Sequence, residues 1–412
     1  MADPLSFCMV TTFYPPHHFG GDAMYVYRLG NALARRGHRV TVVHNVDAYR
    51  ILRRGEPNGS FPHEPGVTVH PIRSSLGPVS PLVTYLTGRP GLTKGPLDEI
   101  FANEHFDVVH FHNISLMGGP GVLEYGDGLK LYTTHEYWLV CPMHVLWKYD
   151  RRPCEKPSCL TCSLTFRRPP QLWRYTNLLE RATRHVDVFL SPGRYAAERH
   201  RERGFAREIR HLPPFVPMGE DTVDAKATQA ERPFFLFVGR LERPKGVQSL
   251  LEVFRSYTAA DLVVVGDGNY GRELRKQAAG LAHVRFLGRL EPSALGGLYR
   301  HAVAVVVPTL GYEVFPFVTV EAFAHGTPAI VRDFGGLAEA VEDSGGGLTF
   351  RTDDELVAAM ESLRTDRALR TELGERGRRA TRERWSEESH LRAYLDLIDQ
   401  ERTMRSPVAP ER

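Results

Sequence analysis

The sequence has no long apolar run, little lysine and only five cysteines. No stretch approaches the roughly 18–20 consecutive apolar residues that a membrane-spanning helix needs. The opening segment MADPLSFCMVTTF has no basic stretch before its apolar residues, so we expect no signal peptide and a cytoplasmic protein. Disulfide bonds are rare in that compartment, which makes reduced cysteines the expectation.

Positive charge is unevenly distributed along the chain. Residues 151–211 hold fourteen Lys and Arg against six Asp and Glu, a local +8, which leaves −5 for the rest against a total of +3. Such a region can meet anionic lipid headgroups or an acidic acceptor. Because it lacks a dense block of like charge, we interpret it as a set of solvated helices, with weak peripheral contact to the inner membrane face as the alternative. Nothing in the chain resembles a nucleic-acid-binding module.

Apolar runs alternate with helical patterns in the first half of the chain. The helical spacing covers residues 23–34 and ends near Gly37. The expected strands are Phe7–Thr12, Arg39–Val43, Asp107–His112, Lys130–Thr134 and Asp187–Leu190. Buried strands that alternate with helices predict an α/β domain with a parallel sheet covered on both faces, here residues 1–214 with an insertion at 141–170.

The pattern restarts after a proline-rich linker, residues 215–232, and predicts a second Rossmann-like domain over 233–385. Its expected strands are Phe234–Val238, Leu262–Val265, Val284–Leu287, Ala302–Val307 and Pro328–Val331, with a helix across Val318–Ala324. Residues 386–402 predict a final helix with one buried stripe, and 403–412 a disordered tail. Doubly wound sheets bind ligands beyond the carboxyl ends of their strands, so two such domains predict a site between them.

The strongest local pattern follows the first strand of the second domain. Gly239-Arg240-Leu-Glu-Arg-Pro-Lys245-Gly246 places a cation, a short loop, a second cation and a helix-opening glycine after a strand. Free amides at a helix N-terminus and two full positive charges form a natural anion site. The alternative is that Arg240 and Lys245 decorate a surface turn.

Two glutamates seven residues apart flank another expected helix start. Glu313 falls in the loop after the strand 302–307, and Glu321 falls about one turn into the helix. Free amides around Phe315–Val318 are expected between them, so that the carboxylates accept hydrogen bonds from sugar and ribose hydroxyls while the amides hold phosphate. Two unrelated glutamates are the competing interpretation.

Together these residues resemble a known family. GRLERPKG at 239–246, the later GDG at 266–268, and the glutamate pair leading into EAFAHGTPAIVRDFGGLAE resemble the donor domain of family-4 retaining glycosyltransferases, which have the GT-B fold. The first domain matches through Gly20-Gly21, His135 and Ser191-Pro-Gly-Arg194. Order and spacing agree over some 300 residues, so the implied fold is GT-B, closed by a C-terminal crossover helix over 386–402.

The resemblance implies roles for individual residues. Arg240 and Lys245 would bind the donor diphosphate, Glu321 the ribose and Glu313 the sugar, while His135 would bond a sugar hydroxyl near the anomeric carbon. The glycines 20 and 21 would let backbone amides approach the diphosphate. The implied catalytic set is His135, Glu313, Arg240 and Lys245. The implied donor-binding set is Gly20, Gly21, Arg240, Lys245, Gly266, Glu313, Val314, Phe315, Phe317 and Glu321.

The implied activity is transfer of a sugar from a nucleoside-diphosphate sugar to a hydroxyl acceptor with retention of anomeric configuration. The mechanism that the resemblance implies is front-face attack, which needs no protein nucleophile and no catalytic metal. The sequence leaves the donor sugar, the nucleotide base and the acceptor open. A nucleotide-sugar 2-epimerase of the same fold is one alternative, and a binding protein with a relic cleft is another. One departure from the family is Pro316 where many members have glycine; it removes an amide but suits a first helical turn.

A competing motif lies at Gly266-Asp-Gly-Asn-Tyr-Gly271, where G-x-G-x-x-G follows the strand 262–265. That spacing is typical of NAD-dependent oxidoreductases, and Glu291 lies twenty residues further on. The fingerprint normally follows the first strand of its domain, however, and here a complete strand–helix unit precedes it. An NAD enzyme would also leave Arg240 and Lys245 unexplained.

Four cysteines crowd into the insertion, in the pattern C-x12-C-x4-C-x2-C: Cys141, Cys154, Cys159 and Cys162. Four thiols predict a structural metal ion, most simply zinc, with an iron–sulfur cluster as the alternative. Unligated thiols are the other interpretation. Residues 141–170 have little apolar periodicity, so a metal would supply the ordering that packing does not.

Overall fold

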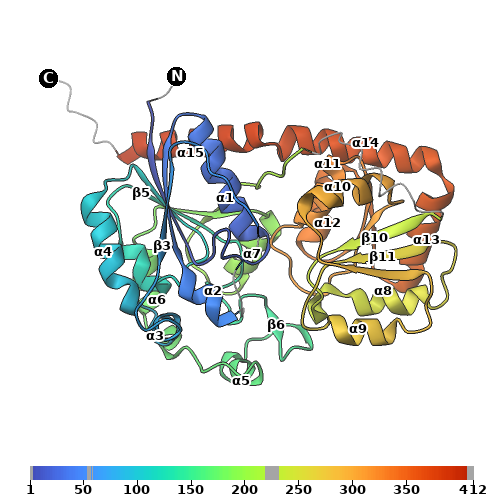
Figure 1. Ribbon diagram of the computed structural model, residues 1–412, viewed down its shortest axis with the longest axis horizontal. Coiled ribbons are helices and arrows are strands. Elements are labelled where there is room, and N and C mark those ends of the chain that lie inside the picture. The colour runs from blue at the N-terminus through green and yellow to red at the C-terminus, as the bar shows by residue number, and fades with distance from the viewer. Residues whose placement is uncertain (1–2, 53–56, 58, 219–231, 406–412) are drawn as a thin grey trace.

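The computed structural model describes residues 3–52, 57, 59–218 and 232–405, which fold into two α/β domains side by side (Figure 1). The first domain has a seven-stranded sheet in the order β3-β2-β1-β4-β5-β8-β9, and every neighbouring pair is parallel. Its strands are β1 (Ser6–Thr11), β2 (Arg39–Asn45), β3 (Val67–Ile72), β4 (Val108–Phe111), β5 (Leu129–Thr133), β8 (Val188–Ser191) and β9 (Ile209–His211). All residues of β1, β4, β5 and β8 are buried, because helices cover both faces of the sheet.

Helices connect these strands by crossovers, as a parallel sheet requires. They are α1 (Gly20–Arg35), α2 (Val46–Leu52), α3 (Val79–Thr87), α4 (Lys94–Asn103), α5 (Cys159–Thr165), α6 (Leu178–Thr183) and α7 (Arg194–Glu202). The short helices η1 (Gly91–Thr93), η2 (Gly119–Glu124) and η3 (Leu172–Tyr175) lie among them. A two-stranded antiparallel ribbon, β6 (Trp147–Lys148) with β7 (Arg152–Pro153), forms part of the expected insertion.

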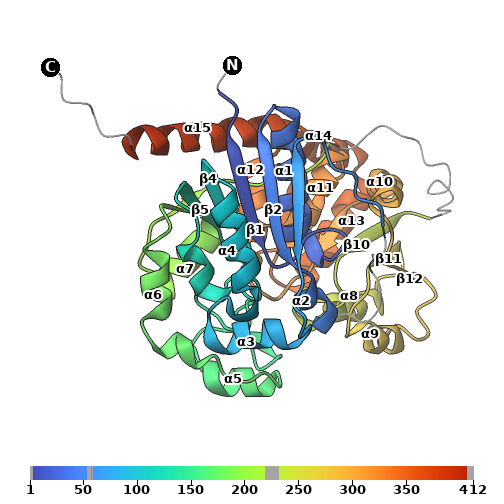
Figure 2. The ribbon, with the colours of Figure 1, turned by 60° about the vertical axis from the view of Figure 1, so that its left-hand side comes forward.

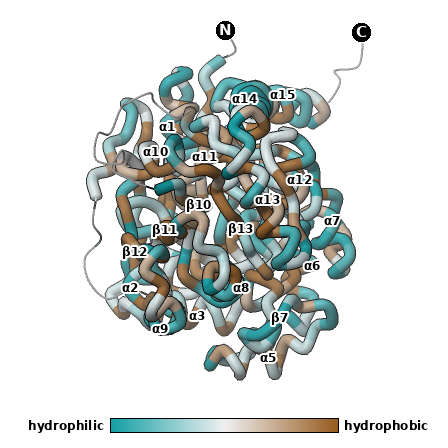
Figure 3. The backbone as a smooth tube through the Cα atoms, turned by 90° about the vertical axis from the view of Figure 1, so that its right-hand side faces the viewer, coloured by the Kyte–Doolittle hydropathy of each residue, from teal (hydrophilic) through white to brown (hydrophobic). Residues whose placement is uncertain are grey.

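The second domain has a six-stranded parallel sheet in the order β12-β11-β10-β13-β14-β15. Its strands are β10 (Phe234–Val238), β11 (Asp261–Val265), β12 (Val284–Gly288), β13 (Val305–Val307), β14 (Ala329–Arg332) and β15 (Gly347–Phe350). Its helices are η4 (Arg243–Lys245), α8 (Val247–Phe254), α9 (Gly271–Gln277), α10 (Pro292–His301), α11 (Phe317–Ala324), α12 (Gly336–Ser344) and α13 (Asp353–Thr365). Hydrophobic residues concentrate along the central strands of this domain (Figure 3).

Two long helices tie the domains together. Helix α14 (Arg367–Arg384) packs on the second domain, and α15 (Glu387–Arg405) crosses back over the first (Figures 1 and 2). Leu391, Tyr394 and Ile398 of α15 are buried in the core formed by β1, β2 and α1. Helix α15 continues three residues past the expected end at 402. Residues 406–412 of the expected tail and 219–231 of the expected linker lie outside the described residues.

The predicted α/β class with two Rossmann-like sheets is confirmed, although three strands of these sheets and the β6–β7 ribbon were not expected. Strands β3, β9 and β15 lack a continuous apolar run, because β3 contains His70 and Pro71, β9 is the three residues Ile209–His211, and β15 begins with glycine. All three are edge strands, which need less apolar surface than central ones. Within the described residues, no helix is both long and apolar enough to span a membrane.

Strand order fixes where a ligand site belongs. In the first sheet the direction of winding reverses between β1 and β4, and in the second between β10 and β13. Loops that leave the carboxyl ends of strands at such reversal points diverge and leave a crevice. The loop after β1 leads to Gly20-Gly21 at the start of α1, and the loops after β10 and β13 contain Arg240 and Glu313.

Candidate active site

Two loops of the second domain bring predicted site residues into contact. Lys245 ends η4 after strand β10, and Glu313 lies in the loop after β13. Because β10 and β13 are parallel neighbours, both loops leave the same edge of the sheet. Lys245 Nζ lies 2.5 Å from Glu313 Oε1, while Arg240 Nη1 lies 2.8 Å from Glu242 Oε1. Each cation therefore has a carboxylate partner from its own domain.

Glu321 has different partners. It lies in the second turn of α11, where Tyr299 Oη donates a hydrogen bond of 3.1 Å to Glu321 Oε2. Burial raises the pKa of Glu321, and the charge of Arg28 together with the Tyr299 hydrogen bond opposes that shift. Arg28 belongs to α1 of the first domain, so an opposite-charge interaction spans the two domains at the expected ribose site. Arg28 stands in no local sequence motif; the available clue is that it lies seven residues after Gly21, on the same face of α1.

The glycine pair begins α1, as the site requires. Gly20 has φ +73°, in the left-handed region where a side chain is strained. A Cβ on Gly21 would lie 3.2 Å from Cδ2 of Phe317, the first residue of α11. The N-terminal ends of the two helices thus face each other across the domain interface, and a larger residue than glycine at position 21 would push Phe317 away.

Asp22, the next residue of α1, also belongs to the site but was missed from the sequence. Burial and the charge of Glu136 raise its pKa to about 6, although the Ala23 amide, the Asn113 side chain and the charge of Arg240 all lower it. A carboxyl group that titrates near neutrality therefore lies within electrostatic range of the predicted phosphate-binding Arg240. Its position directly after Gly20-Gly21 is the only clue in the sequence.

His135 follows β5 and lies in a cluster of histidines. Its Nε2 lies 3.0 Å from Nδ1 of His112, and its ring packs 5.2 Å from that of Tyr25. Burial lowers the pKa of His135 to about 3, so the ring is neutral at physiological pH. A neutral imidazole suits a hydrogen-bonding role toward a sugar hydroxyl better than the role of a charged acid.

The cluster continues beneath His135 to the crossover helix. His110 Nδ1 lies 2.9 Å from Tyr394 Oη, and Tyr25 Oη lies 3.0 Å from Nε2 of His390. The other ring nitrogen of His390 lies 2.7 Å from the Pro213 carbonyl oxygen, where the chain leaves the first domain. Buried polar groups that are hydrogen-bonded to one another form a rigid network. The histidine cluster that contains His135 is therefore connected to α15 and to the start of the linker.

The loop before α11 departs from the expectation for Pro316. Pro316 is the residue preceding the helix, with φ −87°, and not part of its first turn; its carbonyl accepts bonds from Thr319 and Val320. The amide of Phe317 donates to the Phe315 carbonyl at 3.1 Å, so it is already bonded where a free amide was expected. The rings of Phe315 and Phe317 pack edge to face at 5.0 Å.

Val314 contacts the first domain through its backbone. A Cβ on Gly193 would lie 2.6 Å from the Val314 carbonyl oxygen, so only glycine fits in Ser191-Pro-Gly-Arg194. Tyr137 Oη donates a long hydrogen bond, 3.5 Å, to the Glu313 carbonyl. The segment that contains Glu313 is thus held by the first domain on two sides.

The glycines of the G-x-G-x-x-G motif have a packing role. Gly266 has φ +133°, and a Cβ there would lie 1.9 Å from the Gly239 carbonyl oxygen; one on Gly268 would lie 2.4 Å from that of Leu241. The motif therefore lets the loop after β11 pack against the loop that contains Arg240. It follows the second strand of its domain, so it lacks the position of a dinucleotide fingerprint.

The predicted metal site is not supported. Within the described part of the chain, no group of three or more His, Cys, Asp or Glu side chains is arranged to hold a metal ion. Cys141, Cys154 and Cys162 lie in an apolar cluster with Tyr312 and Val314 of the second domain, and Cys159 lies within electrostatic range of the other three. The insertion is poor in apolar residues of its own, but its core also includes side chains from the opposite domain, so packing supplies part of the ordering that a metal was expected to supply.

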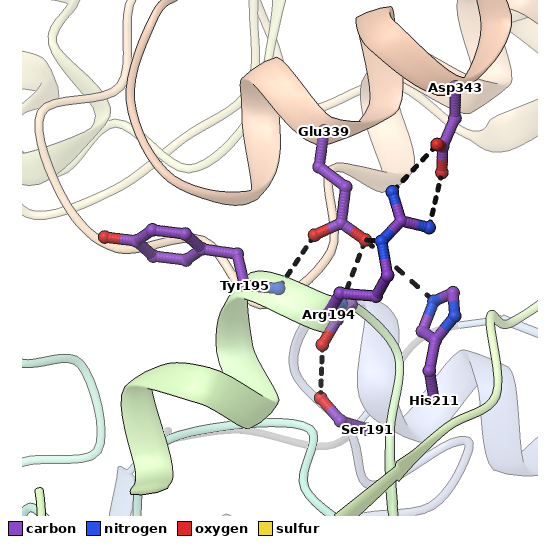
Figure 4. Close-up of polar contacts among 7 residues, drawn as sticks. Ser191, Arg194, Tyr195, His211, Glu339 and Asp343 are labelled. Carbon is purple, nitrogen blue, oxygen red and sulfur yellow. Dashed lines mark hydrogen bonds and ion pairs between the residues drawn. The ribbon is translucent and has the colours of Figure 1, made fainter. Parts of the chain in front are cut away.

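A polar contact holds α7 of the first domain to α12 of the second (Figure 4). Glu339 accepts hydrogen bonds from the backbone amides of Arg194 and Tyr195, at 2.9 and 2.8 Å, and so caps the N-terminus of α7 from across the interface. Arg194 makes two bonds to Asp343, at 3.1 and 2.8 Å. We call these four residues the interdomain latch.

A cavity of about 530 Å³ lies behind α1, next to the start of the linker. Its lining includes Arg28, which also interacts with Glu321, and it is completed by Tyr27, Asn31, Arg35, Pro62, His63, Glu64, Phe215, Val216, Pro217, Met218 and Glu387. The cavity therefore adjoins the predicted donor site and does not contain it.

Comparison with known proteins agrees with this geometry. The model of Glycosyltransferase Family 4 matches residues 19–220, and that of Glycosyl transferases group 1 matches residues 220–380. The glycogen synthase of Mycobacterium tuberculosis is 35% identical over 408 residues, which cover 91% of this chain and 89% of that enzyme. The chain belongs to the group 1 glycosyltransferases.

Other relatives of this glycosyltransferase match over different lengths. The lipopolysaccharide core biosynthesis glycosyltransferase LpsE of Rhizobium meliloti is 30% identical over 223 residues, 52% of this chain and 65% of that enzyme. Sucrose-phosphate synthase of Thermosynechococcus elongatus has a TM-score of 0.73 at 21% identity, covering 97% of this chain and all of that one. HepE of Anabaena, in complex with UDP-glucose, has a TM-score of 0.67 at 16% identity, covering 96% and 100%. These solved structures establish the GT-B fold.

Proposed function

We propose that this glycosyltransferase moves a sugar from a nucleoside-diphosphate sugar to a hydroxyl acceptor, with retention of anomeric configuration. The observation that carries the proposal is the contact of Lys245 with Glu313, beside Arg240 and at the reversal point of the second sheet. A cation and a carboxylate in one contact suit a ligand that has phosphates at one end and sugar hydroxyls at the other. The UDP-glucose complex of HepE supports the same class of donor.

The donor's diphosphate would lie between Arg240, Lys245 and the N-terminal ends of α1 and α11. Both cations would neutralise the charge that grows on the leaving diphosphate, which is where electrostatic stabilisation lowers a barrier most. Glu313 would release Lys245 to the phosphate and accept from the sugar, while Glu321 would accept from the ribose diol. Since two protein cations meet the diphosphate, the proposed reaction needs no divalent cation and should continue in EDTA.

In the reaction itself, the bond between the anomeric carbon and the diphosphate oxygen breaks. The acceptor oxygen forms a new bond to that carbon from the same face, and the acceptor proton passes to an oxygen of the departing diphosphate. Neutral His135 would orient a sugar hydroxyl near the reacting carbon, and no side chain would form a covalent intermediate. The protein then contributes position and charge.

A panel of nucleotide sugars tests the proposal. We expect the enzyme to release nucleoside diphosphate from one of them, and the anomeric proton coupling of the product to show the configuration of the donor. Release that needs no acceptor, with the sugar inverted at carbon 2, would identify the 2-epimerase alternative. Failure of every nucleotide sugar, together with tight binding of NADH, would reverse the assignment.

A further inference from the structure

Helix α3 has its polarity reversed. Its exposed side chains include Val79, Leu82 and Leu86, which are 47, 46 and 43% exposed, whereas Ser80 and Thr84 are fully buried. The spacing of three and then four residues places the three apolar side chains on one face of the helix. A surface helix of a globular protein normally turns such a face to the core.

The same apolar surface continues over neighbouring elements. Helix η3 is bound to α3, because Trp173 Nε1 of η3 donates a hydrogen bond of 2.9 Å to the Tyr85 carbonyl of α3. Helix α5 lies close to η3: the pKa of Tyr175 is raised first by burial and second by the charge of Cys159, the first residue of α5. Figure 2 shows α3 and α5 together at the lower end of the first domain. We call this surface the α3–α5 face; its exposed apolar residues are Leu76, Val79, Leu82, Leu86, Leu92, Leu160, Leu164, Leu172 and Tyr175.

The concentration is high for one surface. These nine residues are most of the fourteen large apolar side chains that are exposed among the described residues. Single exposed apolar residues are ordinary, but a contiguous group marks an interaction site.

The two segments that build the face carry charge of one sign. Residues 65–97 and 156–179, the two segments that build it, contain no aspartate or glutamate. Their exposed cations are Arg73, Arg89, Lys94, Lys156, Arg167 and Arg168. Lys94 pairs with Asp98 of α4, and Arg174 is turned inward, where it donates to the Trp138 carbonyl. Arg168, which follows α5, lies within electrostatic range of Tyr85 on α3, because its charge opposes the rise in the Tyr85 pKa that burial causes. The count over 151–211 concealed this pattern because it averaged the segment with the acidic residues between 180 and 208.

We propose that the α3–α5 face docks on an anionic lipid bilayer. Apolar side chains of this size insert between headgroups, while surrounding arginines attract anionic phosphates, and the two contributions reinforce each other. A second copy of the chain is a poorer occupant, since two such faces would oppose their positive charges. Docking involves the first domain only and is independent of the proposed sugar transfer.

Vesicle flotation of the full-length protein tests the proposal. One preparation is phosphatidylcholine alone, and the other contains added phosphatidylglycerol. We expect the wild type to float with the second only, and less so at high salt, because salt screens surface charge. L82E with L86E, and separately R167E with R168E, should each reduce the partition coefficient at least about tenfold. L287E is the matched control, since Leu287 is 42% exposed on β12 of the second domain.

Each variant should have the thermal unfolding midpoint of the wild type, because all substituted side chains are exposed. The proposal is overturned if the wild type does not float with phosphatidylglycerol, or if both double variants float as it does. It is also overturned if L287E loses binding equally, or if the face variants instead abolish a dimer in sedimentation equilibrium, which would assign the face to a protein contact.

Discussion

Lys245 contacts Glu313 in the proposed donor site, and a variant without its charge tests whether that charge is needed for sugar transfer. Lys245→Ala should lower turnover at saturating donor at least about a hundredfold, because a charge partner of the leaving diphosphate is lost. Initial rates of nucleoside diphosphate release measure this. Arg255→Ala, directly after α8, is the control: it also removes a cation with a carboxylate partner, Glu252 at 3.0 Å, and should leave the rate unchanged. Equal rates for Lys245→Ala and wild type would contradict the proposed site.

The raised pKa of Asp22 predicts that nucleotide affinity depends on pH. Its pKa of about 6 means that it becomes charged as the pH rises through 6, close to Arg240 and to the proposed diphosphate. A bound diphosphate should favour the neutral form of the Asp22 carboxyl, because two negative charges repel. The affinity of the wild type for nucleoside diphosphate should therefore weaken from pH 5 to pH 7.5 more than the affinity of Asp22→Asn. The ratio of the two dissociation constants, from calorimetry, removes the titration of the nucleotide itself. A ratio that does not change with pH would show that Asp22 stays away from the ligand.

Residues in local motifs could be predicted from the sequence, whereas residues that act across the interface could not. Arg240, Lys245 and Glu313 stand next to strand ends and helix starts, where short-range rules apply. Arg28 and Asp22 matter because α1 faces α11, a fact that depends on the docking of two domains. The metal site predicted for the cysteines is not supported for the same reason, since their packing partners include Tyr312 and Val314 of the second domain.

At the scale of elements, the interdomain latch makes a testable contact. Glu339→Ala would leave the first two amides of α7 without their acceptor, and should destabilise the protein by about 1–3 kcal/mol. Urea unfolding measures the difference. Arg392→Ala removes an exposed ion pair within α15 and should cost less than about 0.5 kcal/mol. If Glu339→Ala cost no more than this control, the latch would contribute nothing to stability.

The elements themselves divide by burial. Central strands such as β1 and β10 are continuous apolar runs and were predicted, since both faces of a parallel sheet are covered. Edge strands such as β3 and β15 carry no such run, and their pairing depends on a neighbour far along the chain. The outward apolar face of α3 could not be predicted, because its apolar spacing is the same as that of a helix packed on the core; only the structure shows it turned outward.

For the whole molecule, buried histidines predict acid sensitivity. Burial lowers the pKa of nine histidines among the described residues, and six of them are shifted most: to about 3 for His44 and His135, to about 4 for His200 and His390, and well below the ordinary 6.5 for His110 and His112. Below pH 6.5 the unfolded chain gains protons that the folded chain does not, so the free energy of unfolding falls. The loss approaches about 1.4 kcal/mol per pH unit for each histidine.

Two carboxyl groups act in the opposite direction. Asp22 and Glu321 have raised pKa values, so their contribution is present at low pH and is lost as the pH rises. Urea midpoints at pH 7.5, 6.5 and 5.5 should nevertheless decline, because six histidines outnumber two carboxyls. His390→Asn should make the decline shallower by about one proton. A stability that does not change over this range would contradict the buried, neutral state of the cluster.

The central claim is that the loops after β10 and β13 form a nucleoside-diphosphate site, and calorimetry tests it most directly. Wild-type protein is titrated with UDP, GDP, ADP and NADH, and the titrations are repeated with the Arg240→Ala, Lys245→Ala double variant. We expect one of the three diphosphates to bind to the wild type, the double variant to lose that affinity at least about a hundredfold, and NADH to give no heat. Equal diphosphate binding by both proteins, or binding of NADH alone, would contradict the assignment of this site.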